Sequence, residues 1–447
     1  MSQAYRDYRC VDYDWLGGTI PAHWQWLYLT QVADEQKKKN TGLQEQKVLS
    51  LSYGNIVPKK NIDFGLVPDS FETYQIVNNG NIIMRLTDLQ NDHKSLRTGL
   101  VKERGIITSA YTCLKPRCNS AYLQYLLHSY DAQKLFYGLG GGVRQSIGYK
   151  EIRYINVPVP TESEQAQIVG FLDWKVSQIN KLINVHRRQI ELLQKQNQSV
   201  INQEVTRCDS GWKEIRLGNL GMFRKGQGGS REDDDDGGLS CIRYGDIYRT
   251  GKMSITEPVT RIKQEVIDRY TPVKKGEMLF ALSGETKDEI GQALVNDIAE
   301  DTWTSGDTGI FTCNSSILPH FLAYSLRCPY IIAQRAALAK GDIIVHISVG
   351  ALRQLRIFVP PTFEQNEIIC KLDRICANVD KAASRMNKNI SLLQEYRTRL
   401  ISDVVFGKVD VRDLKVPEYG TVDETAKPYD NNLSGDSPEF LEVHKNE

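Results

Sequence analysis

The chain contains an internal repeat with an offset of 200 residues. Residues 164–173 read EQAQIVGFLD, and residues 364–373 read EQNEIICKLD. The same offset relates the Val-Pro pairs at 159–160 and 359–360, and it continues downstream through Ile190 and Ile390. A repeat of this kind indicates a duplicated structural unit, so we expect two related halves with a pseudo-twofold relation.

Length and composition describe an ordinary soluble protein of more than one domain. The chain has 447 residues, which is too long for one compact core, and 40% of them are hydrophobic and 25% charged. It has neither an apolar run long enough to span a membrane nor an N-terminal signal sequence. Nine cysteines occur without a C-x-x-C pair, which favours a reducing compartment. We therefore expect a cytoplasmic protein.

Charge is unevenly distributed along the chain. The net charge is +1, but residues 1–160 hold 19 Lys and Arg against 14 Asp and Glu, whereas residues 363–447 hold 12 against 16. Residues 207–362 balance at 20 against 20, but would be +4 without the run Asp233 to Asp236. Charge therefore allows basic patches that could contact nucleic acid on both large segments, but it does not require them.

The repeat divides the chain into five segments. Residues 1–160 and 207–362 carry short apolar runs between turn residues and one helix-like stretch each, at 120–135 and 320–338, which predicts two α+β globular domains. Residues 161–206 and 363–410 predict long helices. Residues 411–447 are acidic and aperiodic, and we expect a disordered tail.

The two helical segments carry apolar residues at alternating spacings of three and four, the pattern of a coiled coil. We expect the two copies to pair in antiparallel orientation, with the polar positions Asn197 and Arg397 helping to fix the register. Packing of each helix on its own globular domain is the alternative. The predicted helix-pair seam comprises Val169, Leu172, Val176, Ile179, Ile183, Ile190, Leu193, Ile369, Leu372, Val379, Met386, Ile390, Leu393 and Leu400.

No motif predicts catalysis by this chain. The Gly-rich stretch at 136–148 follows a helix-like segment and lacks the Lys-Ser/Thr of a phosphate-binding loop, and no Asn-Pro-Pro-aromatic tetrapeptide occurs. None of the seven histidines has a second ligand at helical spacing, so we expect no metal site. The acidic run at 232–236 lacks the closing Glu of a calcium loop and predicts a solvated loop.

Several side chains among the predicted turns could contact DNA. Arginine and lysine can bind phosphates or base edges, and tyrosine can pack on sugars or thymine methyl groups. Each of them could equally have an ordinary structural or solvent-exposed role. The candidates are Tyr53, Lys59, Lys60, Arg85, Arg97, Arg104, Tyr111 and Arg144 in the first domain, and Arg243, Tyr244, Tyr248, Arg249 and Lys340 in the second.

The arrangement resembles the specificity subunit of Type I restriction-modification enzymes. Both helical segments open with Pro-x3-Glu-Gln-x2-Ile-x3-Leu-Asp, at residues 160–173 and 360–373. Further similar stretches are residues 15–24, 242–247, 275–280 and 400–410. The resemblance covers residues 12 to about 413.

The resemblance implies a non-catalytic DNA reader. Each globular domain would recognise one half of a bipartite, asymmetric target, and the paired helices would set the distance between the halves. Two modification subunits, which bind S-adenosylmethionine and methylate adenine, would dock on the chain, and translocase/nuclease subunits that use ATP and Mg²⁺ would join for cleavage. The chain itself would bind no cofactor. The acidic run at 232–236 departs from this pattern and should point away from DNA.

Two other interpretations are open on sequence alone. The chain could be a helical scaffold that joins two protein-binding domains, or a stand-alone nuclease or methyltransferase.

Overall fold

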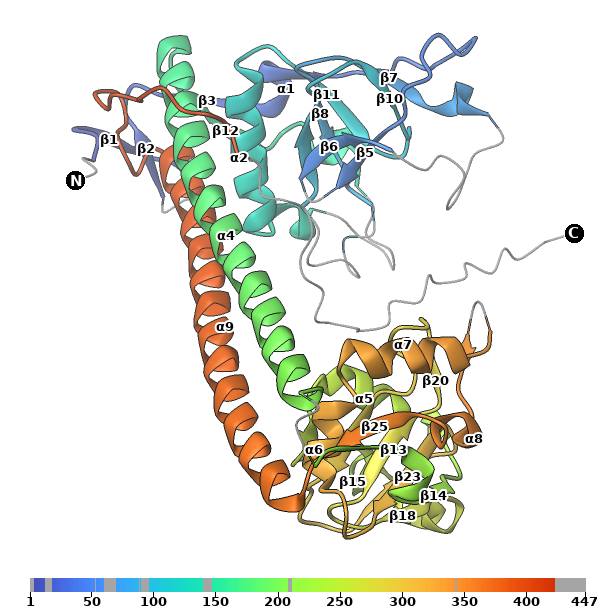
Figure 1. Cartoon of the computed structure of the whole chain (residues 1–447). Coiled ribbons are helices and arrows are strands. Elements are labelled where there is room, and N and C mark those ends of the chain that lie inside the picture. Colours follow the sequence, from blue (N-terminus) through green and yellow to red (C-terminus); the bar gives the residue numbers. More distant parts are fainter. Residues whose placement is uncertain are drawn as a thin grey trace, which may run out of the picture. The chain divides into compact units, whose positions relative to one another are not determined.

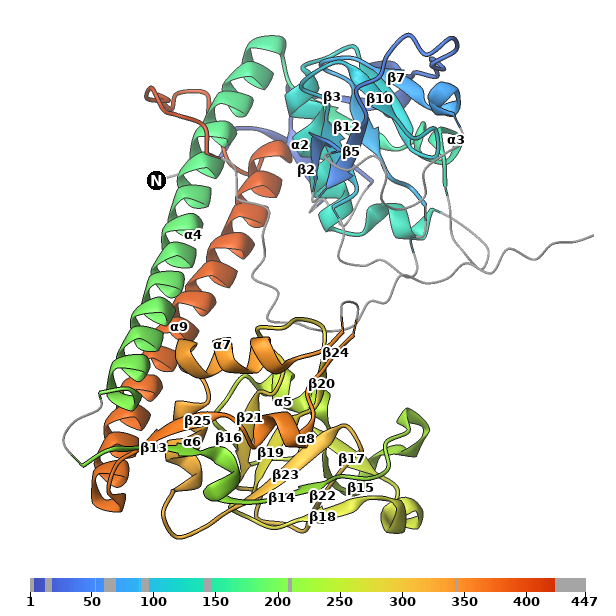
Figure 2. The ribbon, with the colours of Figure 1, turned by 45° about the vertical axis from the view of Figure 1, so that its right-hand side comes forward.

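The computed structural model describes residues 4–12, 18–52, 54–59, 70–87, 89, 96–139, 147–207, 211–341 and 344–422. They form two compact units. Among the described residues, the first unit comprises those up to residue 187 and those from 387 to 422, and the second comprises those from 188 to 386. Each unit therefore contains one globular domain and one end of each of two long helices (Figures 1 and 2).

The two long helices are α4 (Glu162–Val205) and α9 (Thr362–Val405), each of 44 residues. Each would be about 66 Å long at 1.5 Å per residue. They pack together as an antiparallel pair, as the apolar repeat predicts (Figure 1). In the first unit Arg397 Nη1 donates to Asn180 Oδ1 at 2.6 Å, and in the second Asn197 Nδ2 lies 3.5 Å from Cys376 Sγ. Both polar positions thus contact the opposite helix, while their role in fixing the register stays a prediction.

The first domain is built around a four-stranded antiparallel sheet in the order β4-β11-β8-β9, and α2 packs against it. Two-stranded pairs β1-β2, β3-β12, β5-β6 and β7-β10 surround this sheet. The strands are β1 (Tyr8–Cys10), β2 (Thr19–Pro21), β3 (Gln25–Tyr28), β4 (Ala33–Glu35), β5 (Leu49–Ser52), β6 (Asn55–Pro58), β7 (Gln75–Val77), β8 (Ile82–Met84), β9 (Thr98–Leu100), β10 (Gly105–Ile107), β11 (Thr112–Pro116) and β12 (Asn156–Val159). The helical elements are α1 (Leu29–Val32), η2 (Phe71–Thr73), α2 (Ser120–Ala132), η3 (Leu135–Gly138) and α3 (Tyr149–Ile152).

The second domain has a five-stranded sheet, β14-β23-β19-β21-β16, and a four-stranded sheet, β17-β15-β22-β18. The pairs β16-β21 and β15-β22 are parallel. Its strands are β13 (Lys213–Arg216), β14 (Gly221–Lys225), β15 (Asp234–Ile242), β16 (Ser254–Ile255), β17 (Thr260–Ile262), β18 (Thr271–Val273), β19 (Met278–Ala281), β20 (Ser283–Gly284), β21 (Ala293–Asn296), β22 (Thr302–Thr304), β23 (Thr308–Cys313), β24 (Val345–His346) and β25 (Arg356–Val359). Its helical elements are η4 (Leu217–Asn219), η5 (Arg231–Asp233), α5 (Tyr244–Thr250), η6 (Gln264–Arg269), α6 (Pro319–Ser325), α7 (Pro329–Leu338) and α8 (Val349–Leu352).

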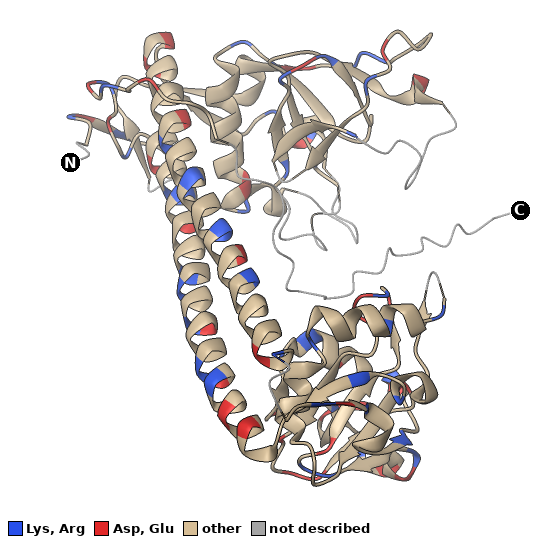
Figure 3. Cartoon of the chain, viewed as in Figure 1, with Lys and Arg blue, Asp and Glu red and all other residues tan. Residues whose placement is uncertain are grey.

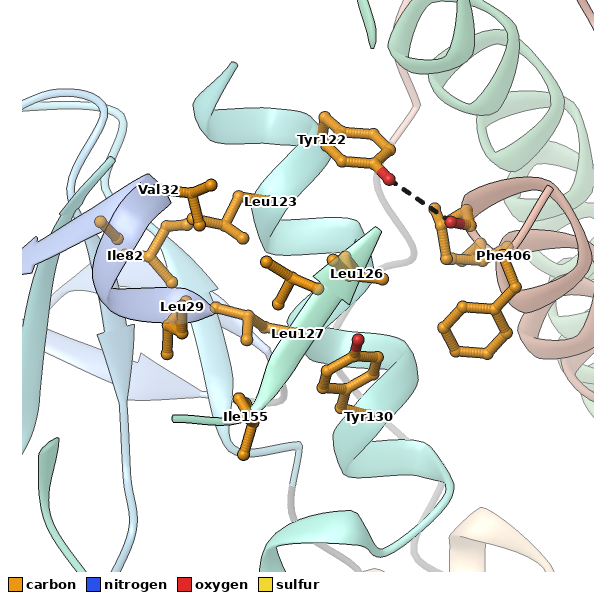
Figure 4. Packing of buried hydrophobic residues seen from close by; sticks show 14 of the residues in the cluster. Leu29, Val32, Ile82, Tyr122, Leu123, Leu126, Leu127, Tyr130, Ile155 and Phe406 are labelled. Carbon is orange, nitrogen blue, oxygen red and sulfur yellow. Dashed lines mark hydrogen bonds between the residues drawn. The ribbon is translucent and has the colours of Figure 1, made fainter. Parts of the chain in front are cut away.

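The core of the first unit joins the domain to the end of α9. Side chains of α2, including Leu126 and Tyr130, pack on the sheet side against Leu29 and on the helix side against Phe406 (Figure 4). The Tyr122 hydroxyl is completely buried and donates to the carbonyl oxygens of Pro158 and Val405, at 2.8 and 3.4 Å. Burial of this apolar surface fixes α9 to the first domain.

The end of α9 also meets the N-terminal strands. Gly407 follows the helix with φ of +73°, and a Cβ there would lie 2.4 Å from Pro21 Cδ. The Tyr8 hydroxyl donates to the Gly407 carbonyl at 3.0 Å. A residue with a side chain would therefore be strained at 407 and would also collide with β2.

Three predictions about local structure need correction. The helix expected at 320–338 is two helices, because Pro329 cannot continue α6 and instead starts α7. The acidic run at 232–236 is not a fully solvated loop, since Asp233 is buried and accepts a hydrogen bond from the Tyr270 hydroxyl at 2.9 Å. The tail expected from 411 onward begins with an ordered segment, residues 411–422, that lies along α4.

Candidate functional site

The repeated motif at the start of each long helix holds a domain in place. Glu164 is buried and accepts hydrogen bonds from the Tyr5 hydroxyl at 2.7 Å and the Trp24 indole at 3.1 Å, while His23 Nε2 lies 2.9 Å away. In the second unit Glu364 accepts from the Trp212 indole at 2.7 Å. The same carboxylate–indole contact thus joins the start of each domain to the start of each long helix.

The glutamine of the motif ties the helix to the domain a second time. Gln165 donates to the Pro160 carbonyl at 2.9 Å and accepts from the Asn119 amide at 3.0 Å. Gln365 donates to the Pro360 carbonyl at 2.9 Å and accepts from the Leu318 amide at 2.7 Å. Both side chains are buried, so each satisfies backbone groups next to a domain helix, α2 or α6.

The aspartate of the motif makes the third contact. Asp173 accepts from the Tyr125 hydroxyl at 2.7 Å, and Asp373 accepts from the Tyr324 hydroxyl at 2.6 Å. Burial raises the pKa of the Asp173 carboxyl, and the hydrogen bond from Tyr125 opposes part of this rise. The motif residues therefore position the domains.

Sequence reasoning matches Trp24 with Trp212 as the corresponding starts of the two domains, but it identified neither their contact with the motif glutamates nor the two tyrosines that donate to the motif aspartates. Tyr125 and Tyr324 are 199 positions apart, and Trp24 and Trp212 are 188 apart, so a fixed offset of 200 does not align them. One sequence signal could have identified the two tyrosines. Each predicted domain helix contains a tyrosine at nearly the same place, and their separation differs by one residue from the repeat offset of 200.

All fourteen predicted seam residues are buried or partly buried. Leu172, Ile179 and Ile183 of α4 and Leu372 and Ile390 of α9 are the buried ones. The helix pair also leaves apolar side chains exposed, with Leu192 and Leu392 at equivalent repeat positions showing 50% and 53% of their surface. In the first unit Leu392 borders a shallow cavity that is also lined by Leu182 and His186.

The candidate DNA-contacting residues of the first domain fall into different environments. Arg97 has no exposed surface, and its guanidinium donates to the carbonyl oxygens of Arg85 and Thr87, at 3.2 and 2.8 Å, and to the Tyr137 hydroxyl. This burial counts against the predicted role of Arg97 in reading bases. The guanidinium of Arg104 is half-exposed and pairs with Glu45 at 3.1 Å.

The other first-domain candidates are less accessible or are not described. Lys59, Arg85 and Tyr111 are partly buried. Tyr53, Lys60 and Arg144 lie outside the described residues.

In the second domain α5 and the residue before it carry four of the five candidates. Arg243 precedes the helix, and its guanidinium contacts Asp234 at 2.5 Å and the Ser230 carbonyl at 2.7 Å, so it holds the acidic run in place. Tyr244 and Arg249 are exposed, and Arg249 lies 3.6 Å from Asp246. Pairing of Asp234 with Arg243 neutralises one charge of the run that the sequence presents as uniformly acidic.

A chain of contacts connects α5 to Lys340. The Tyr248 hydroxyl donates to the Ser283 carbonyl at 2.9 Å, and the Ser283 hydroxyl lies 2.9 Å from His346 Nδ1. The backbone of His346 forms a bridge with that of Lys340, which is exposed. His346 was not among the sequence candidates, because an isolated histidine carries no recognisable signal.

The described part of the chain carries no cluster of three or more His, Cys, Asp or Glu side chains arranged to hold a metal ion. Among the same residues, no helix combines the length and the apolar character needed to cross a membrane.

Two known proteins are similar to this chain in sequence. No protein-family model matches the chain. The Type I restriction enzyme EcoKI specificity subunit of Escherichia coli is 22% identical over 171 residues, which cover 38% of this chain and 36% of that protein. A protein of Methanocaldococcus jannaschii assigned as the type I restriction enzyme MjaX specificity subunit is 23% identical over 327 residues, covering 67% of this chain and 71% of that protein.

A solved structure shares the fold of this chain. A chain from a study of complex assembly and conformational transition of the type I R-M system superposes with a TM-score of 0.66 at 16% identity, covering 87% of this chain and 99% of that one. The chain is therefore similar in sequence, over parts of its length, to specificity subunits of Type I restriction-modification systems, and it shares its fold with a solved structure from a study of such a system. The motif residues described above anchor its two domains to the long helices.

Proposed function

We propose that this chain is a specificity subunit of a Type I restriction-modification system and that it reads a bipartite, asymmetric DNA sequence, with one half-site recognised by each globular domain. The observation that supports this most strongly is that three matched contacts anchor both domains, while the sheets and exposed side chains beyond the anchors differ between the domains. A duplicated anchor with unlike domains suits a molecule that must present two different surfaces to one target.

In this proposal the exposed basic and aromatic side chains of each domain contact DNA. Arg104 is the best-placed candidate of the first domain, and Tyr244, Arg249 and Lys340 are the candidates of the second. An arginine can bind a guanine edge through two hydrogen bonds, and lysine can neutralise a phosphate. Arg97 and Arg243 instead have structural roles, since Arg97 donates to carbonyl oxygens inside the first domain and Arg243 contacts the acidic run.

The helix pair would carry the protein partners. Two modification subunits would dock on it and on the domains, and exposed Leu192 and Leu392, which occupy equivalent repeat positions, offer them two related apolar contacts. S-adenosylmethionine would be bound by those subunits, and ATP and Mg²⁺ by restriction subunits that join the complex. This chain would bind none of these cofactors itself.

Co-expression with the modification subunit of the same system tests the proposal. The complex should methylate adenine in a bipartite sequence, and its binding to duplex DNA should weaken steeply as salt rises, because phosphate contacts release counterions. Failure of the purified subunits to associate, or duplex binding that is insensitive to salt, would contradict the proposal.

A change in helix length tests the role of the helices as a spacer. Four residues inserted into both α4 and α9 would lengthen the pair by about 6 Å. The permitted gap between the half-sites should then change while the half-sites stay the same. Exchange of residues 1–160 for another specificity subunit's first domain should alter one half-site alone.

A further inference from the structure

A C-terminal segment covers one face of α4 in the first unit. We call residues 411–422 the strap. Gln167 Nε2 donates to the carbonyl oxygens of Val411 and Leu414, at 3.0 and 2.6 Å. The strap begins after the five residues that follow the end of α9, and it lies beside α4 (Figures 1 and 2).

Two further side chains of α4 latch the far end of the strap. The Ser177 hydroxyl donates to the Gly420 carbonyl at 2.9 Å and accepts from the Val422 amide at 2.8 Å. Asn180 Nδ2 donates to the Val422 carbonyl at 3.0 Å, while its Oδ1 accepts from Arg397 of α9. Both side chains are buried, with exposed fractions of 6% for Ser177 and 5% for Asn180.

The equivalent face of α9 in the second unit cannot hold a strap of this kind. The positions that correspond to Gln167, Ser177 and Asn180 by the repeat are Glu367, Ala377 and Asp380. Ionised carboxylates and a methyl group donate no hydrogen bond, so they cannot bind backbone carbonyl oxygens. All three residues are exposed.

The two faces differ in neighbouring residues as well. Trp174 of α4 is partly buried, whereas its counterpart Arg374 of α9 is exposed. Figure 3 shows charged residues along the N-terminal part of α9. The covered face is therefore built for intrachain contact and its counterpart for solvent or a partner.

The two ends of the strap are held differently. Val411 belongs to the hydrophobic core of the first unit and Val416 packs against that core, so the near end is fixed by apolar burial. Residues 417–422 have no fully buried member, and their far end is held by the hydrogen bonds to Ser177 and Asn180. This far end can detach from α4 without disrupting the core.

From these contacts we infer that the strap blocks, in the first unit, a partner-docking face that is open in the second, so that the two modification subunits bind with unequal affinity. This inference rests on the proposed function, in which two modification subunits dock on pseudo-twofold related surfaces. The tighter site lies on the open face of α9. Binding at the weaker site requires the strap to be displaced.

The double substitution Ser177→Ala with Asn180→Asp gives α4 the residues that α9 carries at these positions. It removes both donors to the strap, while the carboxylate introduced at position 180 can still accept the hydrogen bond from Arg397. The matched control is Ala377→Ser with Asp380→Asn in the second unit, where the described residues form no strap contact. Circular dichroism should show unchanged helix content in both variants.

Hydrogen exchange of the full chain reports on the latch directly. The Val422 amide should exchange at least about tenfold faster in the Ser177→Ala/Asn180→Asp variant than in the native chain or the control, because it loses its acceptor. Equal exchange in the native chain and the double variant would overturn the latch.

Calorimetric titration with the modification subunit then tests the consequence. The native chain should bind two modification subunits with dissociation constants that differ by about tenfold or more. In the double variant the weaker site should bind more tightly, so that its dissociation constant becomes closer to that of the tighter site. Equal steps in the native chain, or a weaker step that fails to tighten, would overturn the inference alone. Absence of any binding would overturn the proposed function with it.

Discussion

In the first unit a single four-stranded antiparallel sheet packs on α2, whereas the second unit contains a five-stranded and a four-stranded sheet with two parallel pairs. Yet Glu164 and Glu364 each accept a tryptophan indole, and Asp173 and Asp373 each accept a tyrosine hydroxyl. The two units thus share the contacts that attach a domain to a helix and differ in what is attached. The repeat preserves an anchor and leaves the domain surfaces free to diverge.

The largest expected effect comes from the two equivalent leucines of the anchor region. Leu172 and Leu372 have no exposed surface and belong to the cores of different units. Leu172→Ala and Leu372→Ala should each lower the free energy of unfolding by about 2–5 kcal/mol. Urea denaturation followed by circular dichroism measures this. A loss at one position of less than half that at the other would show that the anchors are not equivalent.

Substitution of two arginines separates structural from DNA-contacting roles. Arg97→Met should cost about 1–3 kcal/mol of stability, because two buried carbonyl oxygens lose a donor. Arg249→Ala, at an exposed position, should leave the melting temperature unchanged and weaken binding of the target duplex by about tenfold. Thermal melting measures the first effect, and fluorescence anisotropy of the assembled complex on the target duplex measures the second. Loss of stability in Arg249→Ala together with loss of DNA binding alone in Arg97→Met would reverse our interpretation of these residues.

The glutamates of the anchor should differ in their contribution. Glu164 contacts the side chains of Tyr5, Trp24 and His23. Among the described residues, Trp212 is the one side chain that donates a hydrogen bond to Glu364. Glu164→Gln should therefore lower the free energy of unfolding by about 1–3 kcal/mol, and Glu364→Gln by less than about 1 kcal/mol. Chemical denaturation at constant pH compares them, and equal losses would contradict the asymmetry.

The smallest effect concerns the pH dependence of the first anchor. Because burial raises the pKa of Asp173 above its ordinary value, the protonated form is favoured by folding. Its stabilising contribution is complete below the unfolded pKa and is lost as pH rises through the folded pKa. Asp173→Asn should therefore flatten the loss of stability that accompanies this rise. Melting temperatures recorded between about pH 4 and 7 should show it, and an unchanged slope would argue against the shift.

The sequence predicted the large features because they depend on periodicity. Alternating spacings of three and four place Leu172 and Ile183 on one side of a helix, so two long helices follow from the pattern alone. Turn-rich stretches with apolar runs and one helix-like stretch each likewise predicted two α+β globular domains. Pro329 shows the limit of periodicity, since the helical pattern continues across 320–338 while the proline ends one helix and begins the next.

The candidate site was less predictable because exposure depends on tertiary packing. Arg97 and Arg104 are both arginines among turns, yet one is completely buried and the other half-exposed. Nothing local distinguishes them, since the groups that surround Arg97 come from η3 and from residues 85–87.

The sequence alone determined the duplication, the two long helices and the positions of the motif, because each of these follows from the spacing of residues along the chain. The tertiary structure alone decided what the motif does, since the donors to Glu164, Gln165 and Asp173 lie between 46 and 159 positions away in the chain. The tertiary structure also showed that residues 411–422, at the start of the predicted tail, form the strap along α4. Hydrogen bonds between Ser177 and Gly420 depend on chain closure over 243 residues, which no local pattern encodes.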